Sequence, residues 1–168
     1  SDLMENLSQH TIGYRKYNNG TGWDSIDGGF SGVFDGNYNT ISDFRSVDTL
    51  TDSRGLFNIF SGQIRNLGMI NVTVQCKRFC GGLIANMLSG TINNTYVTNG
   101  SVESLNAGSN SEVGGMLGSM STGRINDSYT NGVTVTVGFN RGGGLVGEFV
   151  GGRSEEHTSE LQSPCNLV

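Results

Sequence analysis

The sequence has very little proline and unusually much glycine. It contains one proline and 27 glycines in 168 residues. A disordered linker is typically rich in both residue types, so this imbalance argues against one. Glycine reaches positive φ at little cost, which suits repeated tight turns between strands. Frequent glycine and β-branched residues also exclude amphipathic helices of useful length.

Charge, long apolar runs and metal-binding side chains are scarce as well. The net charge of −5 is spread along the chain and no basic stripe is present, so we expect no nucleic-acid partner. The apolar runs are only a few residues long, so we expect no membrane insertion in this segment. Only His10 and His157 supply imidazole, and we predict no metal or cofactor. Cys76 and Cys80 either stay unpaired near a turn or form a local disulfide, if the residues between them turn.

The dominant feature of the sequence is an internal repeat. Its kernel occurs as Arg54-Gly-Leu-Phe, Gly81-Gly-Leu-Ile-Ala, Gly114-Gly-Met-Leu-Gly and Gly143-Gly-Leu-Val-Gly. The first three copies are followed by a Gly-x-Ile step, and an earlier copy emerges when Gly32-Val-Phe is laid without gaps over Gly55-Leu-Phe. Such self-similarity is typical of repeat architectures.

The aligned copies give three columns of equivalent residues. The first column recurs at intervals of 23, 27, 33 and 29 residues, so the connecting loops vary while the kernel is kept. The aliphatic columns are Val33, Leu56, Leu83, Met116 and Leu145, and then Ile41, Ile64, Ile92 and Ile125. The third column consists of Asp43, Asn66, Asn94 and Asp127.

Each repeat predicts a strand, a glycine turn, a second strand and a third β-prone run. The third run alternates valine and threonine, as in Val133-Thr-Val-Thr-Val, which is typical of a half-buried strand. One such coil buries its apolar side only against its neighbours, and parallel crossovers are almost always right-handed. We therefore predict an all-β, right-handed parallel β-helix of about five short coils. The aliphatic columns should line its interior, and the Asn/Asp column should occupy a bend.

These motifs resemble the GLUG-motif repeat family. The matching segments are Gly82-Leu-Ile-Ala, Gly115-Met-Leu-Gly and Gly144-Leu-Val-Gly, preceded by Trp23, Phe30-Ser-Gly-Val-Phe-Asp-Gly-Asn and Thr40-Ile. The resemblance covers residues 23–152. It implies a β-helix from a secreted or cell-surface protein of bacteria or archaea, in which such repeats accompany adhesin or IgA-peptidase-like modules.

Two flanking segments do not follow the repeat. Residues 1–22 lack the acidic strand that is usual in the family before Trp23, and we interpret them as an irregular N-terminal cap. Residues 153–163 resemble the translation of a sequencing adapter, which implies that residues 153–168 are a non-native tail. The kernel spacing also requires an apolar residue at position 154, where the sequence has serine. We therefore expect the β-helix to be incomplete at its C-terminal end.

We find no catalytic, cofactor-binding or metal-binding residues in the repeat. The candidate acids are Asp24, Asp27, Asp35 and Asp43, but Asp35 suits a turn and Asp43 falls in the bend column. We therefore expect a non-catalytic extracellular module that acts as a stalk, a spacer or an adhesive surface. Its expected partner is a host-surface protein or a glycan, and we predict no specific oligomer.

Two alternatives to this function stay open. One is a carbohydrate-active β-helix enzyme, a polysaccharide hydrolase or lyase whose acids would lie in a groove flanked by Tyr14, Tyr17 or Tyr38. The other is an accessory domain of a surface peptidase.

Overall fold

In the part of the chain that the structure describes, the regular structure consists of β-strands. The computed structural model describes residues 29–106 and 110–151, and these residues contain no helix. Sheet A comprises β1 (Val33–Ser42), β2 (Arg45–Val47), β5 (Gln63–Cys76), β8 (Thr91–Ser104), β11 (Arg124–Asn126) and β12 (Tyr129–Thr136). Sheet B comprises β4 (Phe57–Phe60), β7 (Ile84–Met87), β10 (Leu117–Met120) and β14 (Val146–Phe149). Sheet C comprises β3 (Ser53–Arg54), β6 (Phe79–Gly81), β9 (Ser111–Gly114) and β13 (Asn140–Gly143).

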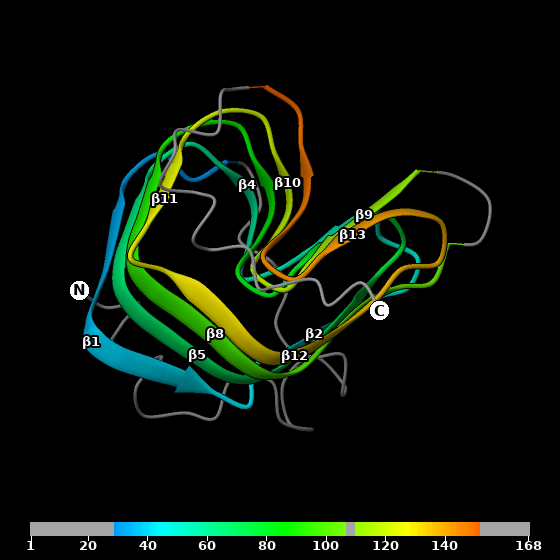
Figure 1. The fold of residues 1–168 in the computed structure, drawn as a ribbon, viewed down its shortest axis with the longest axis horizontal. Coiled ribbons are helices and arrows are strands. Elements are labelled where there is room, and N and C mark those ends of the chain that lie inside the picture. Colours follow the sequence, from blue (N-terminus) through cyan, green and yellow to red (C-terminus); the bar gives the residue numbers. More distant parts are fainter. Residues whose placement is uncertain (1–28, 107–109, 152–168) are drawn as a thin grey trace, which may run out of the picture.

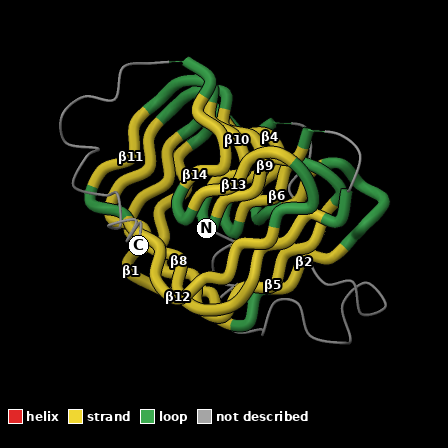
Figure 2. The backbone as a smooth tube through the Cα atoms, turned by 45° about the vertical axis from the view of Figure 1, so that its right-hand side comes forward, coloured by secondary structure: helices red, strands yellow, loops and turns green. Residues whose placement is uncertain are grey.

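The chain runs through sheets A, C and B in that order and then repeats the path. Every strand pairs in parallel with its equivalent in the next turn, so β5 lies beside β8 and β8 beside β12 (Figures 1 and 2). Hydrogen-bonded side chains in successive turns are 30, 28 and 33 residues apart along the chain. The fold is the predicted right-handed parallel β-helix, with about four turns.

The interior of the helix is formed by stacked aliphatic side chains. Ile64 pairs in register with Ile92, and Ile92 pairs with Ile125. The first two are fully buried, while Ile125, in the last turn, is only partly buried. The other aliphatic column lies at the corner between sheets C and B, where backbone hydrogen bonds such as that from Leu83 N–H to Met116 O join successive turns. Its members are Leu56, Leu83, Met116 and Leu145. The first three of these side chains are fully buried and Leu145 is partly buried.

The assignment of the first copy is wrong. Val33 pairs with Gln63 in sheet A and is 56% exposed, so it does not belong to the Leu56 column. Phe34, one residue later, takes the interior place opposite Ile64. This copy is therefore the first strand of sheet A and not a separate kernel, which reduces five coils to four turns.

An irregularity in β1 shifts the register of its second half against β5. Residues 36–38 bulge out where the neighbouring strand has only Asn66, because Asp35 pairs with Arg65 and Asn39 with Leu67. The two extra residues displace everything that follows. Ile41 therefore pairs with Met69, and its side chain is buried as predicted. It does not pair with Ile64, because the gapless alignment laid a strand of sheet A over Gly55-Leu-Phe at the corner between sheets C and B.

The predicted Asn/Asp column does occupy a bend, except that Asp43 belongs to a different bend. Asn66, Asn94 and Asp127 have φ between 46° and 55°, a region that asparagine and aspartate tolerate better than most residues. Asp43 has φ 55° but lies beside Asn71, in a second bend column that continues to Asn99. Each long strand of sheet A is thus bent twice by left-handed residues.

The kernel glycines are required by close packing and not by positive φ. Gly81, Gly114 and Gly143 do not have positive φ. A Cβ on Gly114 would press into the carbonyl oxygen of Leu117 and lie 2.7 Å from the nitrogen of Gly147. Sheets B and C therefore meet backbone to backbone at an acute corner, near the middle of Figure 1. Only glycine fits there, because any side chain would separate the two sheets.

Three predictions concern residues outside the described part. These are the N-terminal cap at 1–22, the tail at 153–168 and the missing apolar residue at position 154.

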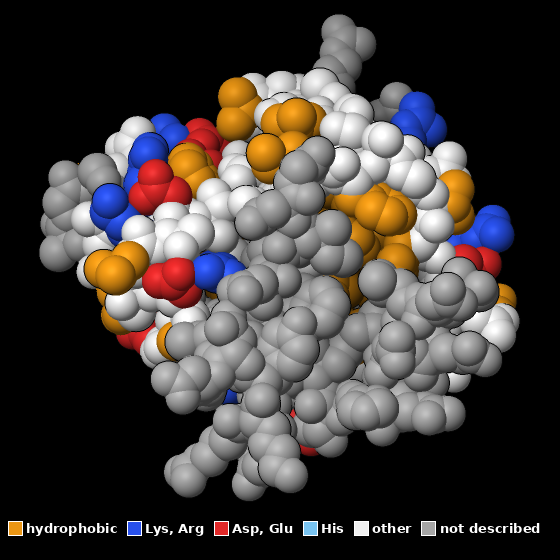
Figure 3. Space-filling model, turned by 180° about the vertical axis from the view of Figure 1, so that it is seen from behind, with side chains coloured by type: hydrophobic (Ala, Val, Ile, Leu, Met, Phe, Trp, Pro, Cys, Tyr) orange, Lys and Arg blue, Asp and Glu red, His pale blue; other side chains and the backbone are white. Residues whose placement is uncertain are grey.

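In the described residues, no helix is long and apolar enough to cross a membrane. Acidic and basic side chains lie next to one another on the face shown in Figure 3.

Candidate functional site

The acids singled out in the sequence do not gather into one site. Asp35 forms an ion pair with Arg65 at 2.8 Å and accepts a hydrogen bond from the backbone N–H of Asn37. These bonds, first of all that of Asn37, lower the pKa of Asp35. Asp43 accepts a hydrogen bond from the Asn71 amide in the neighbouring turn. Both carboxylates thus stabilise bends, while Asp24 and Asp27 lie outside the described residues.

A shallow cleft lies on sheet A beside the β1 bulge. It has a volume of about 70 Å³, and its lining residues are Tyr38, Asn66, Leu67, Gly68, Asn94 and Tyr96. Tyr38 is 77% exposed and has φ 62°. Left-handed backbone is uncommon for an aromatic residue and costs free energy, so the bulge holds this ring at the cleft in a strained conformation.

The opposite wall of the cleft is the ring of Tyr96. Gly68 precedes Tyr96 in the stack of turns, and a Cβ on Gly68 would lie only 2.8 Å from Cε2 of that ring. On the following turn, Tyr129 stacks on Tyr96 with ring centres 5.5 Å apart and planes 15° apart. Tyr129 therefore covers one face of Tyr96, and the end of the Tyr96 ring lies directly over Gly68, whose missing side chain makes room for it.

Amide groups form a ladder along the edge of the cleft. Asn94 donates a hydrogen bond from Nδ2 to Oδ1 of Asn66 at 2.9 Å, and Asn66 donates to Oδ1 of Asp35 at 3.2 Å. The ladder holds the two asparagine side chains in place and uses one N–H of each. A primary amide has two N–H groups and a carbonyl oxygen, so capacity for further hydrogen bonds remains at the cleft.

A second polar cluster lies on the outer side of the corner between sheets B and C. Glu112 on β9 and Glu148 on β14 are hydrogen-bonded to each other, and Ser119 also bonds Glu112. Arg141 on β13 forms an ion pair with Glu148, and its Nη1 atom lies 3.8 Å from Glu112 Oε1. The cluster ties the third turn to the fourth.

The environment of this cluster moves the two carboxyl pKa values apart. Burial, together with the neighbouring Glu148, raises the pKa of Glu112 to about 7. The hydrogen bond from Glu112 and the charge of Arg141 lower the pKa of Glu148. One proton is therefore shared, with Glu112 protonated and Glu148 ionised in mildly acidic solution.

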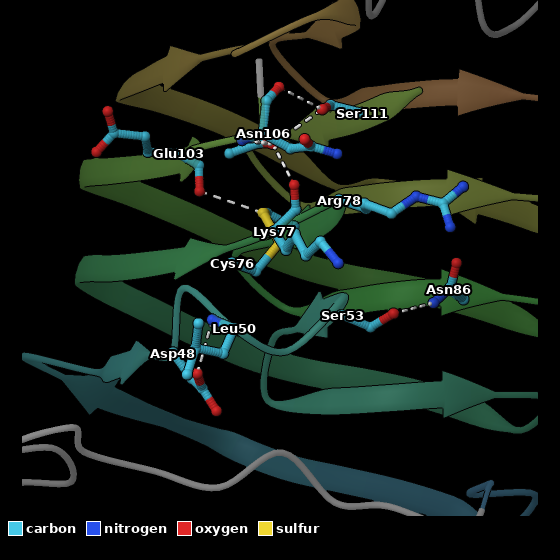
Figure 4. Close-up of a disulfide and its surroundings, with 12 residues drawn as sticks. Asp48, Leu50, Ser53, Cys76, Lys77, Arg78, Asn86, Glu103, Asn106 and Ser111 are labelled. Atoms are coloured by element: carbon cyan, nitrogen blue, oxygen red, sulfur yellow. Dashed lines mark hydrogen bonds between the residues drawn. A yellow bond between two sulfur atoms is a disulfide. The ribbon is translucent and has the colours of Figure 1, made fainter. Parts of the chain in front are cut away.

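The structure joins Cys76 and Cys80 in a disulfide. The bond links the end of β5 to β6, with the two Cα atoms 5.8 Å apart, and both residues are fully buried (Figure 4). Cys80 Sγ lies 3.2 Å from the carbonyl oxygen of Glu103 in the next turn. At the same corner, the buried Ser104 donates a hydrogen bond to Lys77 O at 2.8 Å. Within the described residues, no group of three His, Cys, Asp or Glu side chains could hold a metal ion.

Sequence reasoning missed both the cleft and the acidic cluster, although each leaves a signal. Gly68, Tyr96 and Tyr129 all follow the isoleucine of their turn by four residues. Glu112 and Arg141 each stand two residues before the first glycine of their kernel, which is Gly114 or Gly143. These columns vary in residue type from turn to turn, so a search for invariant columns passes over them.

Comparisons with known proteins give no match. No protein-family model, no curated protein and no solved structure is similar to this chain.

Proposed function

We propose that this chain is a non-catalytic extracellular repeat module of the GLUG type, a stalk, spacer or adhesive surface of a larger secreted or cell-surface protein. The observation that carries the proposal is the constant register of sheet A from β5 through β8 to β12, with twelve paired positions between β5 and β8 alone. Parallel ladders of this kind make a stiff body, because each turn is hydrogen-bonded to the next along the whole strand.

The disulfide supports the extracellular part of the proposal. Disulfides persist in oxidising compartments and are rare in reducing cytosol. The Cys76–Cys80 bond is fully buried at a corner of the β-helix, which fits a disulfide that stabilises the fold.

The acidic cluster is the observation that bears on the alternative function, a polysaccharide hydrolase or lyase. Two carboxyl groups with opposed pKa values are the usual acid and base of glycoside hydrolysis. Those groups stand about 5 to 9.5 Å apart to leave room for the sugar or for water. Glu112 and Glu148 are hydrogen-bonded to each other, and Glu112 is only 6% exposed. This geometry favours a structural acid pair over a hydrolytic one.

Single-molecule force spectroscopy tests the stalk or spacer role. We expect the chain, pulled from its two ends, to resist force and unfold in steps of about one turn. A turn of 28 to 33 residues corresponds to roughly 100 Å of extended chain. Extension without measurable resistance would contradict a load-bearing module.

A hydrolysis assay tests the non-catalytic claim separately. We expect no release of reducing sugar or unsaturated product from a panel of plant, bacterial and host polysaccharides. Release by the unaltered chain that is lost in Glu112→Gln but kept in Glu103→Gln would overturn the proposal in favour of the enzyme.

A further inference from the structure

We propose that the cleft between Tyr38 and Tyr96 binds a neutral saccharide. The inference rests on the proposed function, since it assigns the adhesive surface to particular residues of sheet A. The wall residues come from three successive turns: Tyr38 from the first, Gly68 from the second and Tyr96 from the third.

The aromatic walls fit the apolar side of a sugar ring. Aromatic rings combine a large apolar face with a partial negative charge above that face, which attracts polarised C–H groups. Tyr129 covers one face of Tyr96 and the end of the ring rests on Gly68, so Tyr96 offers a ligand only the part of its ring that lines the cleft. Tyr38 faces the same space from the bulge and is 77% exposed, ready to be covered.

The amide ladder fits the polar edge of a sugar. Hydroxyl groups both donate and accept hydrogen bonds, as do the primary amides of Asn66 and Asn94. Those amides are fixed by the 2.9 Å bond between them, so little side-chain entropy is lost when a ligand binds.

The charge of the lining favours an uncharged ligand. Among the described residues that line the cleft, none carries a charged side chain. The nearest carboxylate in the ladder, Asp35, is paired with Arg65 at 2.8 Å. The apolar side chains of a peptide would use the rings but offer the amides no hydrogen-bond partner, whereas a sugar offers both an apolar face and hydroxyl groups.

Gly68 is the residue that makes the cleft. A Cβ on Gly68 would collide with the end of the Tyr96 ring, so the Gly68→Ala substitution pushes this ring out of its place in the cleft wall. Gly68 has no side chain and the Tyr38 side chain is exposed, so neither residue contributes a side chain to the core. Both positions therefore test binding with little risk to folding.

The experiment is a titration of the whole chain with neutral oligosaccharides. The probes are hexasaccharides built from glucose, mannose, galactose or N-acetylglucosamine, first arrayed on glass and then measured by calorimetry. We expect at least one to bind with a Kd of roughly 0.1 to 1 mM, typical of a shallow site. Tyr38→Ala, Gly68→Ala and Asn94→Ala should each weaken binding at least tenfold, while Tyr38→Phe retains it.

Phe139→Ala is the matched control, since Phe139 is also an exposed aromatic residue and does not line the cleft. It should bind as the unaltered chain does. Three results would overturn the proposal: no binding of any probe at 10 mM, binding that survives Tyr38→Ala and Asn94→Ala, or binding of a proline-rich peptide in place of the sugars. A chain that fails these titrations but resists force in turn-sized steps would be a spacer, so the two proposals fail separately.

Discussion

At the scale of single residues, polar side chains are placed where the turns bend or meet. The carboxyl of Asp48 illustrates the effect, because hydrogen bonds from Thr51 and from the Leu50 N–H, with the Arg54 ion pair, lower its pKa to about 2. Such carboxylates stabilise the folded state above their unfolded pKa and lose that effect only in strong acid. The pKa of Glu112 is shifted in the opposite direction, so its contribution to stability can be separated from theirs by varying the pH.

The free energy of unfolding should fall as the pH rises from 5 to 8. The pKa of Glu112 is about 7 in the folded chain, above the ordinary value of 4.5. Between these values only the unfolded chain loses the proton, so ionisation favours unfolding, by about 3 kcal/mol at the plateau above the folded pKa. The carboxylates of Asp35 and Asp48, with lowered pKa values, stay ionised throughout this range.

Urea denaturation at pH 5 and pH 8 measures this difference, and a matched pair of variants isolates its source. Glu112→Gln should remove most of the pH dependence of the free energy of unfolding. Glu103→Gln should keep it, since Glu103 accepts a hydrogen bond from the Gln75 amide and, among the described residues, does not share a proton with another carboxyl group. An unchanged pH dependence in Glu112→Gln would show that the shared proton is elsewhere.

At the scale of elements, the corner between sheets B and C depends on glycine. Gly114→Ala should lower the free energy of unfolding by about 3 kcal/mol, because the new methyl group meets the Leu117 carbonyl. Gly144→Ala is the control from the next kernel, where a Cβ would meet nothing within 4 Å. Thermal melting of the two variants checks the expectation. Equal melting temperatures would mean that the sheets do not touch backbone to backbone.

The disulfide should contribute modestly to stability, because it closes a short loop. A separation of four residues corresponds to about 2 kcal/mol of loop-closure free energy. We expect Cys76→Ala/Cys80→Ala to lose about that amount in urea denaturation, measured in a Cys165→Ser background with Cys165→Ser alone as the control. In that background, thiol titration of the unreduced, denatured chain should find no free thiol; two would contradict the bond.

The repeat kernel predicted the elements well, for reasons that are also visible at this scale. Ile64 and Ile92 recur because the interior of each turn demands an aliphatic side chain at that place. The first copy was misplaced because the gapless alignment laid Val33-Phe of sheet A over Leu56-Phe at the corner between sheets C and B. The short first interval of 23 residues was the warning, since aligning Phe34 with Ile64 gives 30.

The sites were harder to predict than the fold, because they depend on neighbours in other turns. Tyr96 becomes a wall of a cleft only because Gly68 lies beside it, 28 residues earlier. Glu112 shares a proton only because Glu148 comes next to it from β14. Neither contact is visible until the register between turns is known.

At the scale of the whole molecule, the central claim is the parallel, in-register stacking of turns. Everything else depends on it: the buried columns, the bend ladders, the cleft and the acid pair. The claim also decides between two alignments of β1, since the structure pairs Ile41 with Met69 and the gapless alignment pairs it with Ile64.

A methyl NOE spectrum of the chain labelled at isoleucine and methionine tests this claim most directly. Neighbouring strands lie about 4.8 Å apart, so adjacent turns give strong contacts and turns two apart do not. We predict cross-peaks between Ile64 and Ile92, between Ile92 and Ile125, and between Ile41 and Met69. A direct cross-peak between Ile64 and Ile125, with none from either to Ile92, would contradict the stacking.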